Sequence, residues 1–302
     1  MHHAYDRTIE LRQLRSFVAL AEERHFTRAA ARLHIAQPAL SQQLRRLERE
    51  AGLALVDRSP HHVALTDAGE RLLRRARTIL AEVDAAQAEL AQLGGVVAGR
   101  LTIGVTQTPG PLDVAALLAA FHERHPGVAL DVREGLSVEL AAQLRADAVD
   151  VAFVTTLPDA AAGGIHTTPL AEEDLVLVVG DGHRLARRRA VRIEDLDGER
   201  LVAFRRGATI RAAIEAWAAE RAVRPIVAFE ATDPARTRAL VAAGLAVGVL
   251  PAGDARAPGP PVRALPFRGR RLRHRLHVAV REGRALPPAA TALRDLALER
   301  AG

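Results

Sequence analysis

The stretch from Phe26 to Glu50, FTRAAARLHIAQPALSQQLRRLERE, constrains the fold most, because its pattern predicts two short helices joined by a tight turn. Thr27 has the side chain of a helix N-cap, and Pro38 stands in the first turn of the second helix, where its missing N–H costs nothing. Three leucines at helical spacing should face inward: Leu40, Leu44 and Leu47. The outward face then carries amides, a hydroxyl group and guanidinium groups: Gln37, Ala39, Ser41, Gln42, Arg45, Arg46 and Arg49.

The outward groups of the second helix are those that a DNA major groove accepts. Side-chain amides and guanidinium forks match base edges, while arginines neutralise phosphates. The alternative is an amphipathic helix pair that packs in an ordinary core, and spacing alone does not decide between the two. The flanking sequence favours DNA binding.

Residues 11 to 70 resemble the N-terminal domain of the LysR-type transcriptional regulators over the whole segment, turns included. The matching text is LRQLRSFVALAEERHFTRAAARLHIAQPALSQQLRRLEREAGLALVDRS, followed by ALTDAGE. The resemblance implies a winged helix-turn-helix domain that binds double-stranded promoter DNA, with RNA polymerase as a further partner. Its candidate DNA contacts are Thr27, Arg28, Gln37, Pro38, Ala39, Ser41, Gln42, Arg45, Arg46 and Arg58.

A helix and a hairpin should flank the helix pair. The segment from Leu11 to Glu23 predicts a helix with four apolar residues on one side: Leu14, Phe17, Val18 and Ala21. After Gly52, two β-prone runs around Asp57 to His62 predict the hairpin wing. Arg58 of this wing is expected to reach the DNA backbone or the minor groove.

The wing tip departs from the family pattern. The family usually has phenylalanine where this chain has Val56, and a basic tip where it has Pro60, His61 and His62. One hypothesis is that protonation of the two histidines strengthens DNA binding at mildly acid pH. The alternative is that both are solvated and have no role.

A long helix should follow over residues 67–93, capped by Thr66 and Asp67. Apolar residues recur along it at steps of three and four, the period of a coiled-coil seam: Leu72, Ala76, Ile79, Val83, Ala86, Leu90 and Leu93. We expect a second copy of the helix as its partner; packing onto the chain's own C-terminal domain is the alternative. A two-fold dimer would place two recognition helices in successive major grooves, roughly 34 Å apart, and the resemblance implies a homotetramer.

From Arg100 onward the pattern changes to strands that alternate with helices, which predicts βαβ crossovers and a mostly parallel sheet in two units. This region looks like the periplasmic-binding-protein-like sensor domain of the LysR family. Its segment LVAAGLAVGVLP, residues 240–251, resembles a turn of the second subdomain in that family. The chain should cross between subdomains near residues 167–173 and 265–273.

The expected organisation has five parts. They are an extension at 1–10, an all-α winged helix-turn-helix domain at 11–66, a linker and dimerisation helix at 67–93, a hinge at 94–99, and an α/β effector-binding domain at 100–302. Within the last part, subdomain I would hold residues 100–166 and 272–302, and subdomain II residues 167–271.

An effector is expected where loops follow the carboxyl ends of strands, because backbone N–H groups and helix N-termini converge there and accept anions. This rule, with the resemblance, selects Thr106, Gln107, Thr108, Thr155, Thr156, Phe204, Arg206 and Thr209. Arg206 could pair with a carboxylate or sulfate in bidentate fashion. The predicted effector is a small anionic metabolite. The alternative is that the threonines only cap helices and that Arg206 is a solvated surface residue.

Composition limits the remaining classes of function. The formal net charge of +6 suits a polyanionic partner, although an arginine-rich and alanine-rich sequence can also reflect a GC-rich genome. The chain has no cysteine, so thiolate chemistry and disulfides are excluded. No catalytic motif is present and the 12 histidines lack ligand spacing, so we expect neither an enzyme nor a metal or cofactor. The N-terminus lacks an apolar signal and no run reaches membrane-spanning length, which predicts a cytoplasmic protein.

Overall fold

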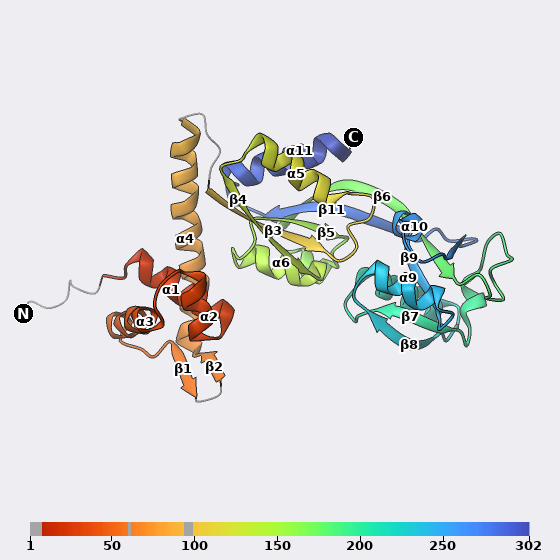
Figure 1. Cartoon of the computed structure of the whole chain (residues 1–302), viewed down its shortest axis with the longest axis horizontal. Coiled ribbons are helices and arrows are strands. Elements are labelled where there is room, and N and C mark those ends of the chain that lie inside the picture. The colour runs from red at the N-terminus through yellow and green to blue at the C-terminus, as the bar shows by residue number, and fades with distance from the viewer. Residues whose placement is uncertain (1–7, 60–61, 94–98, 302) are drawn as a thin grey trace, which may run out of the picture. The chain divides into compact units, whose positions relative to one another are not determined.

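The computed structural model of the chain describes residues 8–59, 62–93 and 99–301 (Figure 1). Residues 1–7 of the predicted extension, the wing-tip residues Pro60 and His61, and the predicted hinge except Gly99 lie outside the described residues. The chain divides into a first unit that runs to Leu90 and a second unit that holds nearly all residues from Ala91 on. None of the described helices combines the length and the apolar surface that crossing a membrane requires.

The first unit contains a three-helix bundle and a two-stranded hairpin. The helices are α1 (Leu11–Glu23), α2 (Phe26–Arg32) and α3 (Gln37–Ala51), and the hairpin pairs β1 (Val56–Ser59) with β2 (His62–Leu65). Six large side chains of α1 and α3 are at most 2% exposed and form the centre of the core: Leu14, Phe17, Leu20, Leu40, Leu44 and Leu47. The predicted helix pair, its inward leucines and the wing are therefore confirmed.

Two details of α1 and α2 differ from the prediction. In α1 the buried side is turned so that Leu20 is fully buried, while Val18 and Ala21 are only half-buried. In α2 the N-cap is His25, because its Nδ1 accepts a hydrogen bond from the backbone N–H of Thr27 at 3.2 Å. Thr27 is an exposed residue inside the helix, so its predicted role as N-cap was wrong.

Helix α4 (Asp67–Leu93) has the predicted bounds. Its N-terminus is capped by Thr66, whose Oγ1 accepts from the backbone N–H of Gly69 at 3.0 Å. A Cβ atom at Gly69 would lie 2.1 Å from the carbonyl oxygen of Leu55, so only glycine lets the helix begin so close to the wing. The first turns of α4 pack into the bundle through Ala76, which is fully buried, whereas Leu90 near its end is 69% exposed.

The described residues of the second unit form one nine-stranded sheet with strand order β4-β3-β5-β11-β6-β9-β7-β8, and β10 pairs with β6 outside this path. The strands are β3 (Gly99–Thr106), β4 (Val128–Gly135), β5 (Val151–Thr155), β6 (Ile165–Val179), β7 (Arg200–Phe204), β8 (Ile226–Ala231), β9 (Val247–Pro251), β10 (Arg263–Pro266) and β11 (Arg273–Arg281). The helices are α5 (Val114–Arg124), α6 (Ser137–Arg145), α7 (Asp159–Ala162), η1 (Ile193–Leu196), α8 (Thr209–Glu220), α9 (Pro234–Ala242), α10 (Ala252–Arg256) and α11 (Pro288–Ala301).

The sheet is mixed, so the prediction of a mostly parallel sheet was wrong. Strand β3 runs parallel to β4 and β5, and β7 runs parallel to β8 and β9, as helical crossovers require. The long strands β6 and β11 lie between these two blocks and run antiparallel to each other and to their other neighbours. The mixture arises because the chain passes between the halves on single strands without a crossover helix.

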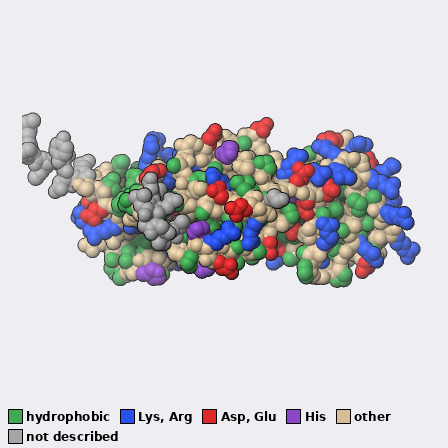
Figure 2. Space-filling view, turned by 90° about the horizontal axis from the view of Figure 1, so that it is seen from above, with side chains coloured by type: hydrophobic (Ala, Val, Ile, Leu, Met, Phe, Trp, Pro, Cys, Tyr) green, Lys and Arg blue, Asp and Glu red, His purple; other side chains and the backbone are tan. Residues whose placement is uncertain are grey.

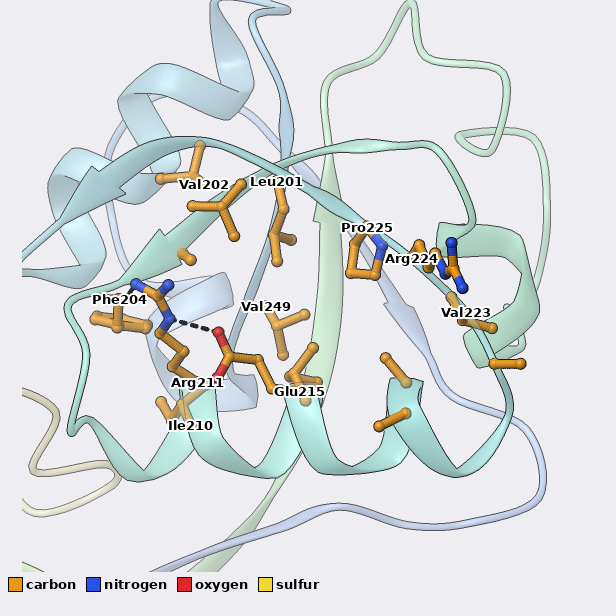
Figure 3. A pocket seen from close by; sticks show the side chains of 16 residues that line it. Leu201, Val202, Phe204, Ile210, Arg211, Glu215, Val223, Arg224, Pro225 and Val249 are labelled. Carbon is orange, nitrogen blue, oxygen red and sulfur yellow. Dashed lines mark hydrogen bonds and ion pairs between the residues drawn. The ribbon is translucent and has the colours of Figure 1, made fainter.

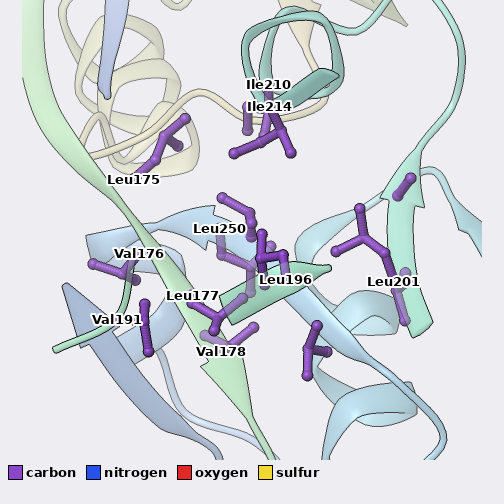
Figure 4. Close-up of a cluster of buried hydrophobic side chains, with 14 of the residues drawn as sticks. Leu175, Val176, Leu177, Val178, Val191, Leu196, Leu201, Ile210, Ile214 and Leu250 are labelled. Carbon is purple, nitrogen blue, oxygen red and sulfur yellow. The ribbon is translucent and has the colours of Figure 1, made fainter. Parts of the chain in front are cut away.

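The two halves of the second unit have separate cores. One cluster holds residues between Leu175 and Leu272 and defines subdomain II (Figure 4). Two other clusters, built on β3, β5 and β11 with α5 and α11 or with α6, belong to subdomain I. The first crossing falls in unbroken β6 between Asp174, which pairs with β11, and Leu175, which pairs with β9. This is just beyond the predicted range of 167–173, while the return crossing between β10 and β11 lies close to the predicted one.

Candidate functional site

The outward face of α3 is the first candidate site. Gln37, Pro38, Gln42, Arg45 and Arg46 are exposed, and Ala39 and Ser41 are half-buried, while the leucines of the opposite side are buried. Proline stands in the first turn of the helix as predicted. Thr27 and Arg28 are exposed on α2. The structure thus brings nine of the ten predicted DNA contacts onto the two helices; the tenth, Arg58, lies in β1, and its side chain is outside the described part.

The arginines on α3 differ in their partners. Arg46 is held inside the unit, because it pairs with Glu50 at 2.8 Å and with Glu10 at 3.0 Å. Arg45 and Arg49 are exposed, and within the described residues neither makes a hydrogen bond or an ion pair. Their guanidinium groups are therefore available to an external anion without first leaving a carboxylate. The sequence pattern did not separate Arg45 from Arg46.

Polar side chains that sequence reasoning missed hold α3 in place. Gln13 and Ser16 of α1 are 1% and 2% exposed, although both are polar. Gln13 Nε2 donates to Glu50 at 2.9 Å, and the Ser16 hydroxyl donates to the side chain of Gln43. Buried polar groups of this kind must be paired, so these bonds fix how α3 lies on α1. A polar residue next to Leu14 or Phe17 on an otherwise apolar side was the available signal.

Glu48 connects α3 to the wing. Its Oε1 accepts from the backbone N–H groups of Leu55 and Val56 at 3.1 and 3.3 Å, where β1 begins. A surface hollow of about 560 Å³ lies beside these residues and is lined by Gln42, Arg45, Glu48, Arg49, Gly52, Leu53 and Ala54. The exposed guanidinium groups of α3 therefore stand at the edge of a concave surface next to the wing.

The second candidate site lies in the second unit, where subdomains I and II meet. A chain of hydroxyl groups joins the ends of β3 and β5 to the first residues of α6 and α8. Ser137 Oγ lies 2.8 Å from Thr155 Oγ1 and 3.4 Å from Thr106 Oγ1, and Thr155 Oγ1 lies 2.6 Å from Thr209 Oγ1. Ser137 begins α6 and Thr209 begins α8, so two helix N-termini converge on this chain. Such an arrangement can accept an anion.

The structure therefore brings Thr106, Thr155 and Thr209 together, and it adds Ser137, which sequence reasoning missed. Ser137 follows the end of β4, and the rule about carboxyl ends of strands could have found it. The other predicted residues lie nearby in sequence but are less involved. Gln107 is half-buried, Thr156 is exposed, and Phe204 is buried in the core of subdomain II.

Arg205, not the predicted Arg206, is the arginine that joins the two subdomains here. Its Nη2 donates to Glu139 Oε2 of α6 at 2.9 Å. The same Glu139 oxygen accepts from the backbone N–H of Leu136 at 2.8 Å. Arg206 is exposed, and within the described residues it makes no hydrogen bond or ion pair.

The crossing strands carry two polar residues next to this site, one buried and one half-buried. Glu173 of β6 and His274 of β11 stand opposite each other in the ladder. His274 is 3% exposed; burial lowers its pKa, and Nε2 donates to the carbonyl oxygen of Thr108 at 2.7 Å. Glu173 Oε2 accepts from the backbone N–H of Gly253 at 2.6 Å, and burial raises the pKa of this carboxyl. These two bonds tie the crossing strands to the Thr108 loop of subdomain I and to α10 of subdomain II.

A metal centre finds no support in this arrangement. Within the described residues, no group of three or more His, Asp or Glu side chains is placed to hold a metal ion.

Comparison with known proteins gives a consistent assignment for both units. Residues 11–70 match the model described as "bacterial regulatory helix-turn-helix protein, lysR family", and residues 94–302 match the "LysR substrate binding domain". The hydrogen peroxide-inducible genes activator of Escherichia coli O157:H7 is 34% identical over 244 residues, which cover 81% of this chain and 79% of the activator.

Solved structures agree along nearly the whole chain. A full-length OxyR variant from Pseudomonas aeruginosa superposes with a TM-score of 0.73 and 27% identity, covering 98% of this chain and 95% of that one. Full-length CbnR, solved in complex with its target DNA, has a TM-score of 0.68 and 28% identity, covering 97% of this chain and 100% of that one.

Proposed function

Because the chain belongs to the LysR family of DNA-binding transcriptional regulators, which are not enzymes, we propose that dimers of it bind a pseudo-palindromic promoter site and respond to a small anionic effector. The observation that carries the DNA-binding half is the outward face of α3. It exposes amides and the guanidinium groups of Arg45 and Arg49, which make no hydrogen bond or ion pair among the described residues, while Leu40, Leu44 and Leu47 hold the opposite side in the core. Amides and guanidinium groups are what base edges and phosphates bind.

Dimerisation is supported by exposed apolar residues of α4. Ile79 and Leu90 of the predicted seam are 45% and 69% exposed, and a stripe of this kind is stabilised when a second helix covers it. In the proposed assembly two dimers form a tetramer on the promoter and bend the DNA between their sites. The family's usual operator, a T-N11-A interrupted palindrome, fits the separation of two recognition helices, and RNA polymerase is the further partner.

The effector site is proposed at the hydroxyl chain between the subdomains. Hydroxyl donors and two helix N-termini favour a carboxylate or sulfate over a cation there. Binding would change how subdomain II lies on subdomain I and so the spacing of the DNA-binding pairs. A ligand can do this only if it binds the two arrangements with different affinity.

A thiol cannot be the sensor in this chain. One relative is named for induction by hydrogen peroxide, but this sequence contains no cysteine. Sulfenic acid and disulfide formation both need a cysteine thiolate. We therefore propose that the signal is a molecule that binds reversibly.

A mobility-shift titration on the gene's own upstream region, with a scrambled competitor, tests DNA binding. If a dimer neutralises about six phosphates, the affinity should fall with salt at a log–log slope of about −5. Footprinting with and without candidate acids then tests the effector. Equal affinity for the scrambled fragment would refute sequence-specific binding, and thermal-shift hits confined to neutral compounds would refute the anionic effector.

A further inference from the structure

A pocket of about 490 Å³ lies inside subdomain II, away from the hydroxyl chain (Figure 3). Helix α8 forms one wall, and β7, β8 and β9 form the other. Figure 3 shows Leu201 and Val249 pointing from the strands toward the helix. Of the residues predicted for the effector site only Phe204 lines this pocket, and none of the four hydroxyl groups does. Its volume lies within the usual range for small-molecule sites.

Two of the three charged side chains that line the pocket, Arg211 and Glu215, are paired with each other. Arg211 of α8 is 6% exposed and stands at the end near Phe204. Its guanidinium donates to Glu215 at 2.7 Å, to the carbonyl oxygen of Phe204 at 3.0 Å, and to Glu230. A ligand carboxylate at Arg211 would have to displace one of these glutamates; Arg224, the third charged lining residue, is exposed and lies at the opposite end of the pocket. A neutral ligand leaves the pairs intact, and a hydroxyl group on it can donate to Glu215, which lines the pocket.

We propose that this pocket is a second small-molecule site of the regulator, for a neutral and largely apolar molecule that carries one hydrogen-bond donor. Its apolar body lies between Leu201, Val249 and Ile214, and its donor faces Glu215. Burial of apolar surface supplies the affinity, and the pairing of Arg211 with two glutamates, one of which lines the pocket, disfavours an anion at that end.

Helix α8 connects the pocket to the hydroxyl chain. The helix begins at Thr209, whose hydroxyl contacts Thr155 of subdomain I, and its inward side covers the pocket. A molecule in the pocket would therefore contact the same helix as the proposed effector. This coupling, unlike the pocket itself, rests on the effector site that is proposed at the hydroxyl chain.

The test uses 4-tert-butylbenzyl alcohol and, as the anionic analogue of the same ring, 4-tert-butylbenzoate. Binding to the full chain is followed by calorimetry and by the fluorescence of Trp217, which is the one tryptophan of the chain and lies on α8. We expect saturable binding of the alcohol that the benzoate does not displace. Absence of saturable binding, or equal competition by the benzoate, overturns the proposal.

Two exposed neighbours on β8 give a matched pair of variants. Val227 lines the pocket and is 40% exposed, whereas Ile226 is 55% exposed and does not line it. Val227→Lys should weaken binding of the alcohol by about tenfold or more, because it places a solvated ammonium group at an apolar wall of the pocket. Ile226→Lys should change the affinity for the alcohol by no more than about twofold. Ala218→Leu, which fills the pocket, and Ala216→Leu, on the exposed side of α8, repeat the comparison. Equal effects within both pairs refute the site.

The coupling is tested in a separate experiment, which measures the affinity of the protein for operator DNA with and without the alcohol. A change in wild type that Val227→Lys abolishes supports it. Saturable binding with unchanged operator affinity keeps the site and overturns the coupling. Because calorimetry needs no DNA, a failure of the proposed promoter binding leaves the test of the pocket intact.

Discussion

Two surfaces of this protein are rich in arginine, and on each of them some arginines are paired with a carboxylate and others are not. Figure 2 shows many basic side chains gathered over subdomain II. Some of those that the structure describes there have a carboxylate partner within 3.0 Å, as in the pairs Arg184–Glu199, Arg188–Asp195, Arg263–Asp181 and Arg270–Glu220, whereas others, such as Arg187, Arg189 and Arg268, make no ion pair among the described residues. On α3, Arg45 and Arg49 have none among the described residues.

This difference bears on the two explanations of the positive charge. An arginine already paired with a carboxylate adds little to the attraction of a polyanion, because the pair is nearly neutral at a distance of a Debye length. The paired arginines of subdomain II fit an arginine-rich composition that is balanced locally. Arg45 and Arg49, which make no ion pair among the described residues and lie on the outward face of α3 beside exposed amides, fit a nucleic-acid surface. The location and pairing of the charge therefore carry more information than the net charge of +6.

The largest effect is expected where pairing fails inside subdomain II. Arg238 is 6% exposed and donates to the backbone carbonyl oxygens of Asp254, Ala257 and Pro260. Among the described residues its guanidinium group therefore makes no ion pair with the side-chain carboxylate of Asp254. Asp254 Oδ2 has no hydrogen-bond partner among the described residues. Burial, the nearby Glu173 and, in the opposite direction, Arg238 together raise the pKa of Asp254 from 3.8 to about 6.

The sign of the pH dependence follows from that shift. A carboxyl with a raised pKa contributes stability below its unfolded pKa of 3.8 and loses it as the pH rises through about 6. Asp254→Asn, which stays neutral, should therefore be more stable than wild type at pH values near 8, by up to about 3 kcal/mol, and the gap should vanish near pH values of about 4. Urea denaturation of both proteins across this range measures it. A constant gap, or a destabilised variant at high pH, contradicts the pKa shift.

Arg45→Ala is expected to have the next largest effect, on DNA binding. If the free guanidinium fork reads a base, its loss should weaken the operator complex by about 1 to 3 kcal/mol and relax one position of the site. Competition assays with single-base operator variants measure both effects. A loss that is uniform over all sequences would make Arg45 a phosphate contact instead, and no loss would remove α3 from the interface as proposed.

More of the first unit than of the second could be predicted from the sequence, and the reason is physical. Helical periodicity fixes which side of a helix is apolar, so α3, its leucines and the bounds of α4 were predictable from residues 26 to 93. Partners between distant segments are not periodic. Nothing local to Arg45 or Arg46 shows that Glu10 pairs with only one of them, and nothing in the β6 segment shows that it pairs with β11 from Ile165 to Asp174.

The hydroxyl chain between the subdomains also shows that contacts between distant segments are hard to predict from the sequence. Strand ends selected Thr106, Thr155 and Thr209, because the rule depends only on element order. The choice between Arg205 and Arg206 depends on the backbone of the β7–α8 loop, where Gly207 has a φ of +89° and a Cβ atom would lie 3.0 Å from Leu136. A close approach of this kind is invisible in the sequence. It directs Arg205, and not its neighbour, toward Glu139.

Arg46→Ala should weaken DNA binding less than Arg45→Ala, by under about 1 kcal/mol. Arg46 is held by Glu10 and Glu50, so a phosphate must compete with two carboxylates for it. The measurement is the same operator titration at one salt concentration. The double variant Glu10→Gln/Glu50→Gln is the control, since it frees Arg46 and should strengthen binding. An equal loss for both arginine variants would show that pairing does not decide which arginine meets DNA.

The smallest effect is expected from arginines on subdomain II that are already paired. Arg188→Ala and Arg270→Ala each remove one partner of an exposed ion pair, with Asp195 at 2.8 Å and with Glu220 at 2.8 Å. Such pairs are worth at most about 1 kcal/mol to stability, and their loss should leave the salt dependence of operator binding unchanged. Arg49→Ala on α3 should instead lower the magnitude of the log–log slope by about 1 for each copy that contacts a phosphate. If the subdomain II variants lowered the slope as much as Arg49→Ala, DNA would contact both surfaces, and the contrast between them would be one of composition and not of function.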